Sequence, residues 1–310
     1  NNGYENRHWH LDESLHVTNW ITRTAAREIK RRDPNRPAFW HVSYTHPHPP
    51  LVPLASYEAL YQDIPIDLPV MSNWSNQPVE KLPMALQVVR DYWPAKWSEG
   101  EMRNLRRAYY ALCTHIDHQI RILIGTLREE DLLNDTVILL TADHGDMLGD
   151  HGLYLEGPMF YEGVLRVPLI IAGPGIPADR CIESPVSTID LAATFLESAG
   201  LKNPSIQSRS LHPVIQGQEI RECAWSEWHV HPARLGVALE LRAIRTANYS
   251  YTYEFGSGSG ELYDLRQDPE QMTNHFEDPA WRDVRDQMHE LLLNRPGTIR
   301  SDLAEPVGIA

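Results

Sequence analysis

Residues 136–157 read TVILLTADHGDMLGDHGLYLEG, and the rest of the predicted fold is arranged around them. Thr136 to Thr141 form a continuous run rich in β-branched residues and leucine, which is typical of a strand buried on both faces of a parallel sheet. Asp143 and His144 follow where that strand should end. Ligands bind at the carboxyl ends of strands in open α/β sheets, so this carboxylate and imidazole are well placed as metal ligands. The alternative is a polar turn in which Asp143 caps the next segment.

Helical and strand patterns alternate on both sides of this stretch. Apolar residues recur every four positions between Ser14 and Arg32, and Ser98 with Glu101 forms a capping box ahead of a long apolar periodicity that ends near Leu127. Two further runs, Pro37 to Tyr44 and Arg166 to Ala172, read as buried strands, and a helix starting near Ser187 ends at Gly200. This alternation predicts a layered α/β domain in which helices flank a sheet.

The segment from Leu51 to Trp97 is irregular and rich in proline. Loops of this length within a compact domain are usually functional or disordered, and its tryptophans argue against disorder. We interpret it as a wall or lid beside a substrate pocket, and a packed surface loop is the alternative.

The pattern changes after Gly217. Ala247 to Phe255 alternates tyrosine or phenylalanine with polar residues, which predicts a half-exposed antiparallel strand. Asp278 and Pro279 then open a last helix. We therefore predict a catalytic α/β domain over residues 1–217 and a small α+β subdomain over 218–310.

Composition excludes several classes of function. The chain has 310 residues and a formal net charge of −14, so its surface is unsuited to non-specific binding of nucleic acid or anionic membranes. Cys113, Cys181 and Cys223 are widely spaced and indicate neither a disulfide framework nor a zinc ribbon. No apolar run is long enough to span a membrane, and no signal-peptide pattern opens the sequence. We expect a cytoplasmic protein; a periplasmic or secreted location and a homo-oligomer stay open.

The runs TADHGDMLGDHGLY (141–154) and FYEGVLRVPLIIAGPG (160–175) closely resemble the second half of type I sulfatases, within the alkaline phosphatase superfamily. The ELYDL run that starts at Glu261 resembles the C-terminal subdomain of the same family. The resemblance implies an alkaline phosphatase-like α/β fold with a small C-terminal α+β subdomain. It also implies that Asp143 and His144 are metal ligands, with calcium the expected ion and manganese or magnesium the alternatives.

Pro47-His48-Pro49-Pro50 is similar to the family's Pro-His-x-Pro motif, whose histidine contacts the sulfate and is a candidate proton donor to the leaving oxygen. The resemblance assigns this catalytic role to His48. A histidine suits the role because it titrates near neutral pH. His46, one proline away, is the alternative in register.

Two departures from the family stand out. Type I sulfatases place a sulfate-binding lysine thirteen residues after the metal-binding aspartate, and this position holds Glu156. The C/S-x-P-x-R motif that yields the formylglycine nucleophile is absent, and Asn1 aligns well inside the family domain. We therefore expect the formylglycine and the remaining metal ligands to lie outside this chain.

The resemblance to type I sulfatases implies metal-dependent hydrolysis of small-molecule sulfate esters, of the arylsulfatase type. A phosphonate monoester or phosphodiester hydrolase of the same superfamily is one alternative. A catalytically inactive sulfatase-like protein is the other, because of Glu156 and the absent motif.

Overall fold

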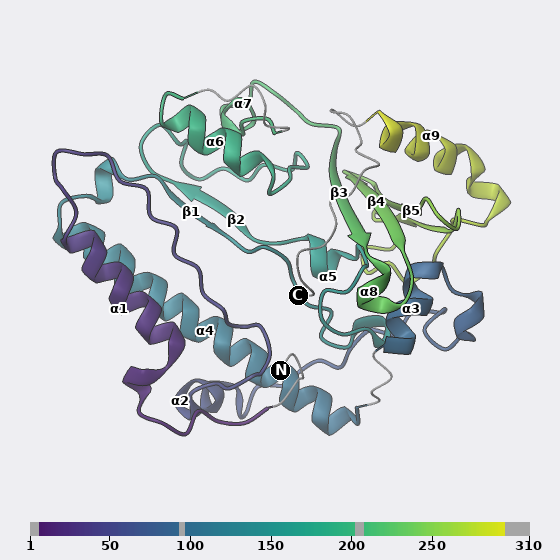
Figure 1. Cartoon of the computed structure of the whole chain (residues 1–310), viewed down its shortest axis with the longest axis horizontal. Coiled ribbons are helices and arrows are strands. Elements are labelled where there is room, and N and C mark those ends of the chain that lie inside the picture. The colour runs from purple at the N-terminus through teal and green to yellow at the C-terminus, as the bar shows by residue number, and fades with distance from the viewer. Residues whose placement is uncertain (1–5, 93–96, 202–207, 295–310) are drawn as a thin grey trace. The chain divides into compact units, whose positions relative to one another are not determined.

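The computed structural model describes residues 6–92, 97–201 and 208–294, and Figure 1 shows their helices and strands. The chain divides into two compact units. The first comprises Asn1–Pro69 and Lys96–Ile138, and the second comprises Val70–Ala95 and Leu139–Ala310. The predicted division at residue 217 follows the sequence rather than these spatial groups and stays a prediction. None of the described helices is long and apolar enough to cross a membrane.

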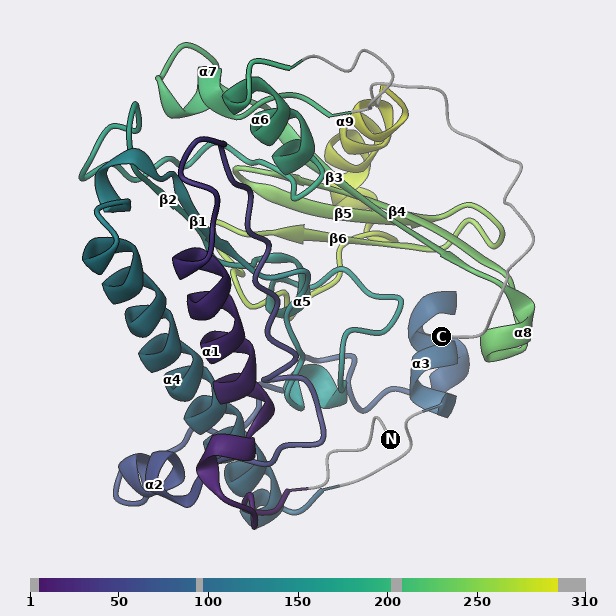
Figure 2. The same ribbon diagram turned by 60° about the vertical axis from the view of Figure 1, so that its left-hand side comes forward.

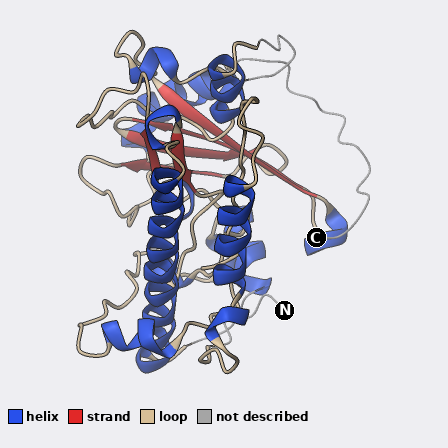
Figure 3. Ribbon diagram, turned by 90° about the vertical axis from the view of Figure 1, so that its left-hand side faces the viewer, coloured by secondary structure: helices blue, strands red, loops and turns tan. Residues whose placement is uncertain are grey.

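Two helices, α1 (Val17–Lys30) and α4 (Glu99–Glu129), lie side by side in the first unit (Figures 2 and 3). The predicted capping box opens α4: the Ser98 N–H donates to Glu101 Oε2 over 2.8 Å, and Ser98 Oγ accepts from the Glu101 N–H over 3.3 Å. One side of α4 is buried through Met102, Leu105, Ala108, Ala111 and Leu112. The short helix α2 (Ala55–Glu58) belongs to the same unit.

The buried side of α1 is mostly polar, which the apolar spacing between Ser14 and Arg32 did not predict. Its buried residues are Thr18, Asn19, Thr22 and Ile29. Thr18 Oγ1 lies 3.2 Å from His46 Nδ1, and Asn19 Oδ1 lies 2.6 Å from His115 Nε2. Burial of these polar groups is tolerated because each has a hydrogen-bond partner.

The predicted strand from Pro37 to Tyr44 is wrong. The segment forms no strand, its residues are exposed or half-buried, and the Phe39 side chain is 70% exposed. No described strand pairs with it, so its backbone lacks the ladder that a buried strand requires.

The strand β1 (Ile138–Thr141), which belongs to the second unit from Leu139 on, pairs with β2 (Leu169–Ala172). The prediction that β1 is buried on both faces is wrong, because all four of its residues are half-buried. Ile170 of β2 is 59% exposed. Among the described residues this sheet has only two strands.

A four-stranded antiparallel sheet of order β3-β4-β5-β6 follows (Figure 2). Its strands are β3 (Cys223–Val230), β4 (Leu239–Thr246), β5 (Tyr249–Glu254) and β6 (Gly260–Asp264). Helix α9 (Arg282–Leu293) covers one face, where Met288 and Leu292 pack in one cluster with Tyr251. The predicted strand over 247–255 and the last helix are therefore confirmed.

The polar side of β5 is buried, although the alternating pattern predicts that it is exposed. Ser250, Thr252 and Glu254 are 2%, 6% and 3% exposed. Thr252 lies opposite Ala243 of β4, and Ala243 belongs to a second buried cluster. The sheet is thus covered on both faces, and one of its covered faces carries hydrogen-bonded polar groups.

The remaining helices of the second unit are α3 (Met84–Tyr92), α5 (Glu162–Leu165), α6 (Asp190–Ser198), α7 (His212–Ile215) and α8 (Pro232–Leu235). The predicted helix that ends at Gly200 corresponds to α6, and Gly200 takes a φ of 69° after it. The proline-rich segment 51–97 contains α2 and α3, and its Trp93 lies outside the described residues. Its assignment as a wall or lid stays a prediction.

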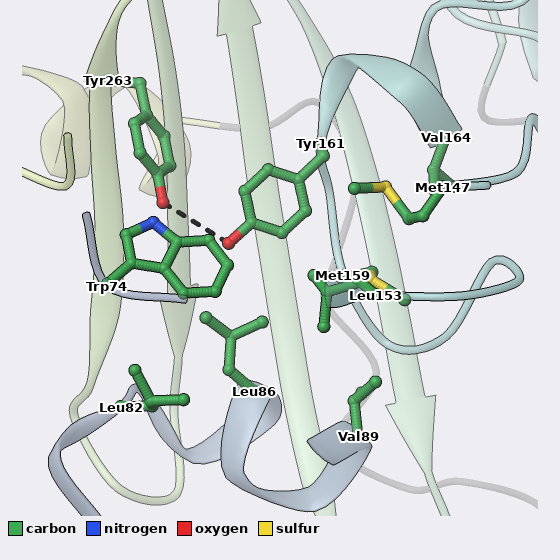
Figure 4. Packing of buried hydrophobic residues seen from close by; sticks show 10 residues of the cluster. All are labelled: Trp74, Leu82, Leu86, Val89, Met147, Leu153, Met159, Tyr161, Val164 and Tyr263. Carbon is green, nitrogen blue, oxygen red and sulfur yellow. Dashed lines mark hydrogen bonds between the residues drawn. The ribbon is translucent and has the colours of Figure 1, made fainter. Parts of the chain in front are cut away.

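A core cluster joins this proline-rich segment to the segment that follows β1 (Figure 4). It brings together Trp74, Leu82, Leu86, Val89, Met147, Leu153, Met159, Tyr161, Val164 and Tyr263. The loop after the Asp143-His144 pair is therefore anchored by its own apolar side chains.

Candidate functional site

Asp143 and His144 lie directly after β1, as predicted. Their side chains are 88% and 37% exposed, and Asp143 Oδ2 lies 3.8 Å from His144 Nε2. The His144 backbone N–H donates to Asp143 Oδ1 over 3.0 Å. Both side chains are therefore accessible from solvent and lie close enough to contact the same bound ion.

The hydrogen bond of the His144 ring assigns its tautomer. His144 Nδ1 lies 2.9 Å from the carbonyl oxygen of Gly145. Because a carbonyl only accepts, this contact is a hydrogen bond only when Nδ1 carries the proton, and in the neutral ring Nε2 then has the lone pair. Metal-binding histidines use this arrangement, in which one ring nitrogen donates to an oxygen and the other binds the ion.

Asp143 and His144 fit a divalent ion as two ligands of an incomplete set. A carboxylate suits calcium, magnesium and manganese, whereas an imidazole favours transition metals. Within residues 6–92, 97–201 and 208–294, no three His, Cys, Asp or Glu side chains gather in a way that could hold a metal. The described residues therefore contain two candidate ligands but no complete metal site.

Gly145 fixes the backbone immediately after the pair. Its N–H donates to Val164 O over 2.8 Å. A Cβ built on Gly145 would lie 2.0 Å from the carbonyl oxygen of Gly163. The two backbones can approach this closely only because residue 145 has no side chain.

The loop that follows stores backbone strain. Leu148, His151 and Leu155 have φ values of 46°, 58° and 60°. Such left-handed conformations cost non-glycine residues free energy and persist only where the surroundings impose them. Asp146 Oδ1 is one such restraint, because it accepts from the backbone N–H groups of Leu148 and Leu155 over 2.9 and 3.2 Å.

Glu156 lies near the end of this loop, between Leu155 and Gly157, and is half-buried. Among the described residues its carboxylate makes no hydrogen bond or ion pair. No cation in the described chain therefore neutralises Glu156. Its predicted place beside a bound anion stays a prediction.

His48 lies in the first unit, whereas Asp143, His144 and Glu156 lie in the second. His48 is half-buried, and its Nδ1 lies 2.7 Å from Pro49 O, which leaves Nε2 for another partner. His46 is only 8% exposed, and burial lowers its pKa to about 4. His46 is therefore enclosed and neutral at pH 7, which favours His48 for contact with a substrate.

Two clusters of buried polar residues were missed by sequence reasoning. The first, the histidine cluster, consists of His16, His46 and His115: the His16 ring lies 5.0 Å from the His46 ring and 4.8 Å from the His115 ring. The second, the tyrosine–glutamate cluster, consists of Tyr161, Tyr263 and Glu261. The ELYDL run contains Glu261 and Tyr263, but no local pattern indicated that the members of either cluster lie together.

Two surface cavities lie away from the predicted site residues. One of about 360 Å³ is bordered by His8, Glu58 and Arg107. The other, of about 400 Å³, is bordered by His229, His231 and other residues of the antiparallel sheet. Neither cavity is lined by Asp143, His144, Glu156 or His48.

Comparison with known protein families gives two matches. The family described as "Sulfatase" matches residues 4–201, and the family described as "N-sulphoglucosamine sulphohydrolase, C-terminal" matches residues 149–296. The first match alone covers more than half of the chain.

Two curated relatives support the first match. An arylsulfatase of Clostridium perfringens is 30% identical over 298 residues, which are 94% of this chain and 60% of the relative. A choline-sulfatase of Rhizobium meliloti is 33% identical over 264 residues, which are 81% of this chain and 50% of the relative. The chain thus spans between half and three fifths of these two relatives.

One solved structure supports the fold. The phosphonate monoester hydrolase of Agrobacterium radiobacter aligns with a TM-score of 0.80 at 24% identity, covering 92% of this chain and 61% of that one. The predicted alkaline phosphatase-like α/β fold is confirmed by this similarity.

Proposed function

Because this chain belongs to the sulfatase family, we propose that it carries metal-binding and leaving-group residues of a sulfate-ester hydrolase of the arylsulfatase type. The observation that carries the proposal is the Asp143-His144 pair. The exposed Asp143 carboxylate lies 3.8 Å from His144 Nε2, and the other ring nitrogen, Nδ1, donates to the Gly145 carbonyl. Relatives with the names arylsulfatase and choline-sulfatase support sulfate esters as the substrate class.

Asp143 and His144 would hold a divalent ion, with calcium as our first choice and manganese or magnesium as alternatives. When bound, such an ion polarises the ester oxygens as a Lewis acid. Asp143 would supply a negative charge to balance the ion. Gly145 O keeps the His144 proton on Nδ1, so that Nε2 is available to bind the ion. The formylglycine nucleophile would come from outside these 310 residues.

His48 would assist departure of the alcohol or phenol. Its Nδ1 faces Pro49 O, so the proton that it transfers is held at Nε2. A protonated imidazole can give that proton to the leaving oxygen as the ester bond breaks. His46 does not compete for this role, because its ring is enclosed beside Thr18.

The second candidate is a phosphonate monoester or phosphodiester hydrolase, because Glu156 stands where the resemblance leads us to expect a sulfate-binding lysine. A carboxylate about 4 Å from an anionic substrate would repel it by about 4 kcal/mol in a partly screened site. Sulfate monoesters, phosphonate monoesters and phosphodiesters each carry one negative charge on the reacting group, so this repulsion alone does not separate the two candidates. The structural similarity to a phosphonate monoester hydrolase is in line with this alternative.

The two candidates separate in a direct comparison of substrates. The complete gene product would be assayed with 4-nitrophenyl sulfate and with 4-nitrophenyl phenylphosphonate, before and after chelation and return of the metal. The sulfatase proposal predicts a higher kcat/KM for the sulfate. A higher kcat/KM for the phosphonate selects the second candidate, and no turnover of either ester supports an inactive binding protein.

A further inference from the structure

Glu261 is a buried carboxylate that the proposed chemistry does not use. It lies on β6 and is 4% exposed. Its Oε1 accepts hydrogen bonds from the hydroxyl groups of Tyr161 and Tyr263, the latter over 2.7 Å. Among the described residues no cation pairs with it. Burial raises the pKa of Glu261, and the two tyrosine hydrogen bonds oppose that rise.

A carboxylate in this position does little for stability. Desolvation of an ionised group is costly, and two neutral phenols offset only part of that cost. Burial and the neighbouring Glu261 also raise the pKa of both tyrosines well above 10, so both hydroxyls remain protonated donors. Groups with such strongly shifted pKa values are often found at functional sites. The contacts of Tyr161 lead from this cluster toward the Asp143-His144 pair.

Tyr161 stands at the start of α5, and the antiparallel sheet holds that helix at several points. The next residue, Glu162, pairs with Arg245 of β4 over 3.2 Å, and its backbone N–H donates to Gln271 Oε1 over 2.7 Å. Figure 4 shows the Tyr161 ring beside Trp74, with its hydroxyl directed toward that of Tyr263. The position of α5 is therefore set by side chains of the C-terminal sheet and of the segment after it.

The α5 segment in turn determines the surroundings of His144. Val164 O accepts from the Gly145 N–H over 2.8 Å, and Gly163 packs against the Gly145 backbone. Gly145 O is the partner of His144 Nδ1. A continuous path of contacts thus runs from Glu261 through Tyr161, α5 and Gly145 to the imidazole, and every residue of it lies in the second unit.

We propose that Glu261 and Tyr161 are positioning residues for His144. By fixing α5 they hold the carbonyl of Gly145 against His144 Nδ1, which keeps the ring in the Nδ1–H tautomer and Nε2 free for a ligand. The metal-binding half of this inference rests on the proposed function. The tautomer half concerns only the geometry of this chain.

The test reads the His144 tautomer directly. Long-range ¹H–¹⁵N correlation spectra of ¹⁵N-histidine-labelled chain at pH 7.5, assigned with His144→Gln, distinguish the protonated ring nitrogen. The variants are Tyr161→Phe, which deletes one hydroxyl, Glu261→Leu, which deletes both acceptor oxygens, and Glu261→Gln, which keeps an acceptor. Tyr251→Phe is the matched control, because among the described residues the hydroxyl of this buried tyrosine of β5 bonds only with His289, over 3.0 Å, in the cluster under α9.

We expect the Nδ1–H tautomer in the parent chain, Tyr251→Phe and Glu261→Gln, and a mixture of tautomers in Tyr161→Phe and Glu261→Leu. In the complete gene product, Mn²⁺ titration should then show about a tenfold weaker Kd for Tyr161→Phe than for Tyr251→Phe. Unchanged spectra in Tyr161→Phe would overturn the inference, whether or not Glu261→Leu folds. A parent protein that binds no Mn²⁺ but shows the tautomer shift would contradict the proposed function alone.

Discussion

Acid should destabilise the first unit through its histidine cluster. His16, His46 and His115 are 0%, 8% and 1% exposed. Burial, and next the neighbouring imidazoles, lower the pKa of His46 and of His115 from 6.5 to about 4. Burial also lowers the pKa of His16, although a hydrogen bond to Val52 opposes that change.

The direction of the change in stability with pH follows from proton uptake by the unfolded chain. Between pH 6.5 and about pH 4, an unfolded histidine binds a proton that the folded one does not, so the free energy of unfolding falls as the pH falls. The contribution is complete above pH 6.5. For a pKa of about 4 in the folded state, the loss between pH 7 and pH 5 is about 2 kcal/mol per histidine.

Urea unfolding followed by circular dichroism at pH 7, 6 and 5 measures this loss. In His115→Gln the amide can still donate to Asn19 Oδ1 but cannot titrate, so the loss should shrink by about 2 kcal/mol. The exposed His41 provides the matched control, and His41→Gln should behave as the parent does. Glu261 has a raised pKa, so its protonation increases the free energy of unfolding as the pH falls. This contribution is the same in the parent and in His115→Gln, so it does not affect the difference between them.

An equal loss of stability in His115→Gln and the parent would refute the reasoning. The histidine cluster would then not be the source of the acid sensitivity. Carboxylates with lowered pKa values, such as that of Asp264, lose their contribution only below the chosen window.

Three further predictions concern single substitutions. Gly145→Ala should cost about 3 kcal/mol in the free energy of unfolding, because its Cβ would lie 2.0 Å from Gly163 O. Gly125→Ala, in the interior of α4 with no atom within 4 Å, should instead raise the free energy of unfolding by up to about 1 kcal/mol. Equal midpoints of the two variants in urea would contradict this. Asp190→Asn should cost about 3 kcal/mol in the free energy of unfolding, because it leaves the buried Arg221 guanidinium without its full counter-charge. Asp286→Asn, which removes an exposed aspartate from its pair with Arg285, should cost under about 1 kcal/mol, and similar unfolding curves for the two variants would count against the buried pair. Glu156→Lys in the complete gene product should bind sulfate more tightly by calorimetry, and an unchanged Kd would mean that residue 156 does not face the anion.

Local signals in the sequence predicted several elements well. Ser98 and Glu101 defined the start of α4 because a capping box depends only on residues three apart. The tyrosine alternation defined β5 for a similar reason. The Asp143-His144 pair was located because a polar cluster directly after a strand is itself a local pattern.

Features that depend on distant partners were not predictable. Residues 37–44 have the composition of a strand, but no described strand pairs with them. The polar side of β5 is buried because a second cluster packs on it. The histidine cluster draws its members from three separate segments, and the bond between Tyr161 and Glu261 joins residues 100 positions apart. No periodicity in the sequence records such pairings.

The central claim is that Asp143 and His144 bind the metal of a sulfate-ester hydrolase, and metal content tests it most directly. Elemental analysis of the dialysed complete gene product would compare the parent with Asp143→Ala and with Asp63→Ala, a variant of an exposed aspartate in the first unit. We expect a bound divalent ion in the parent and in Asp63→Ala, and the loss of both the ion and sulfate release in Asp143→Ala. An unchanged metal content in Asp143→Ala would contradict it.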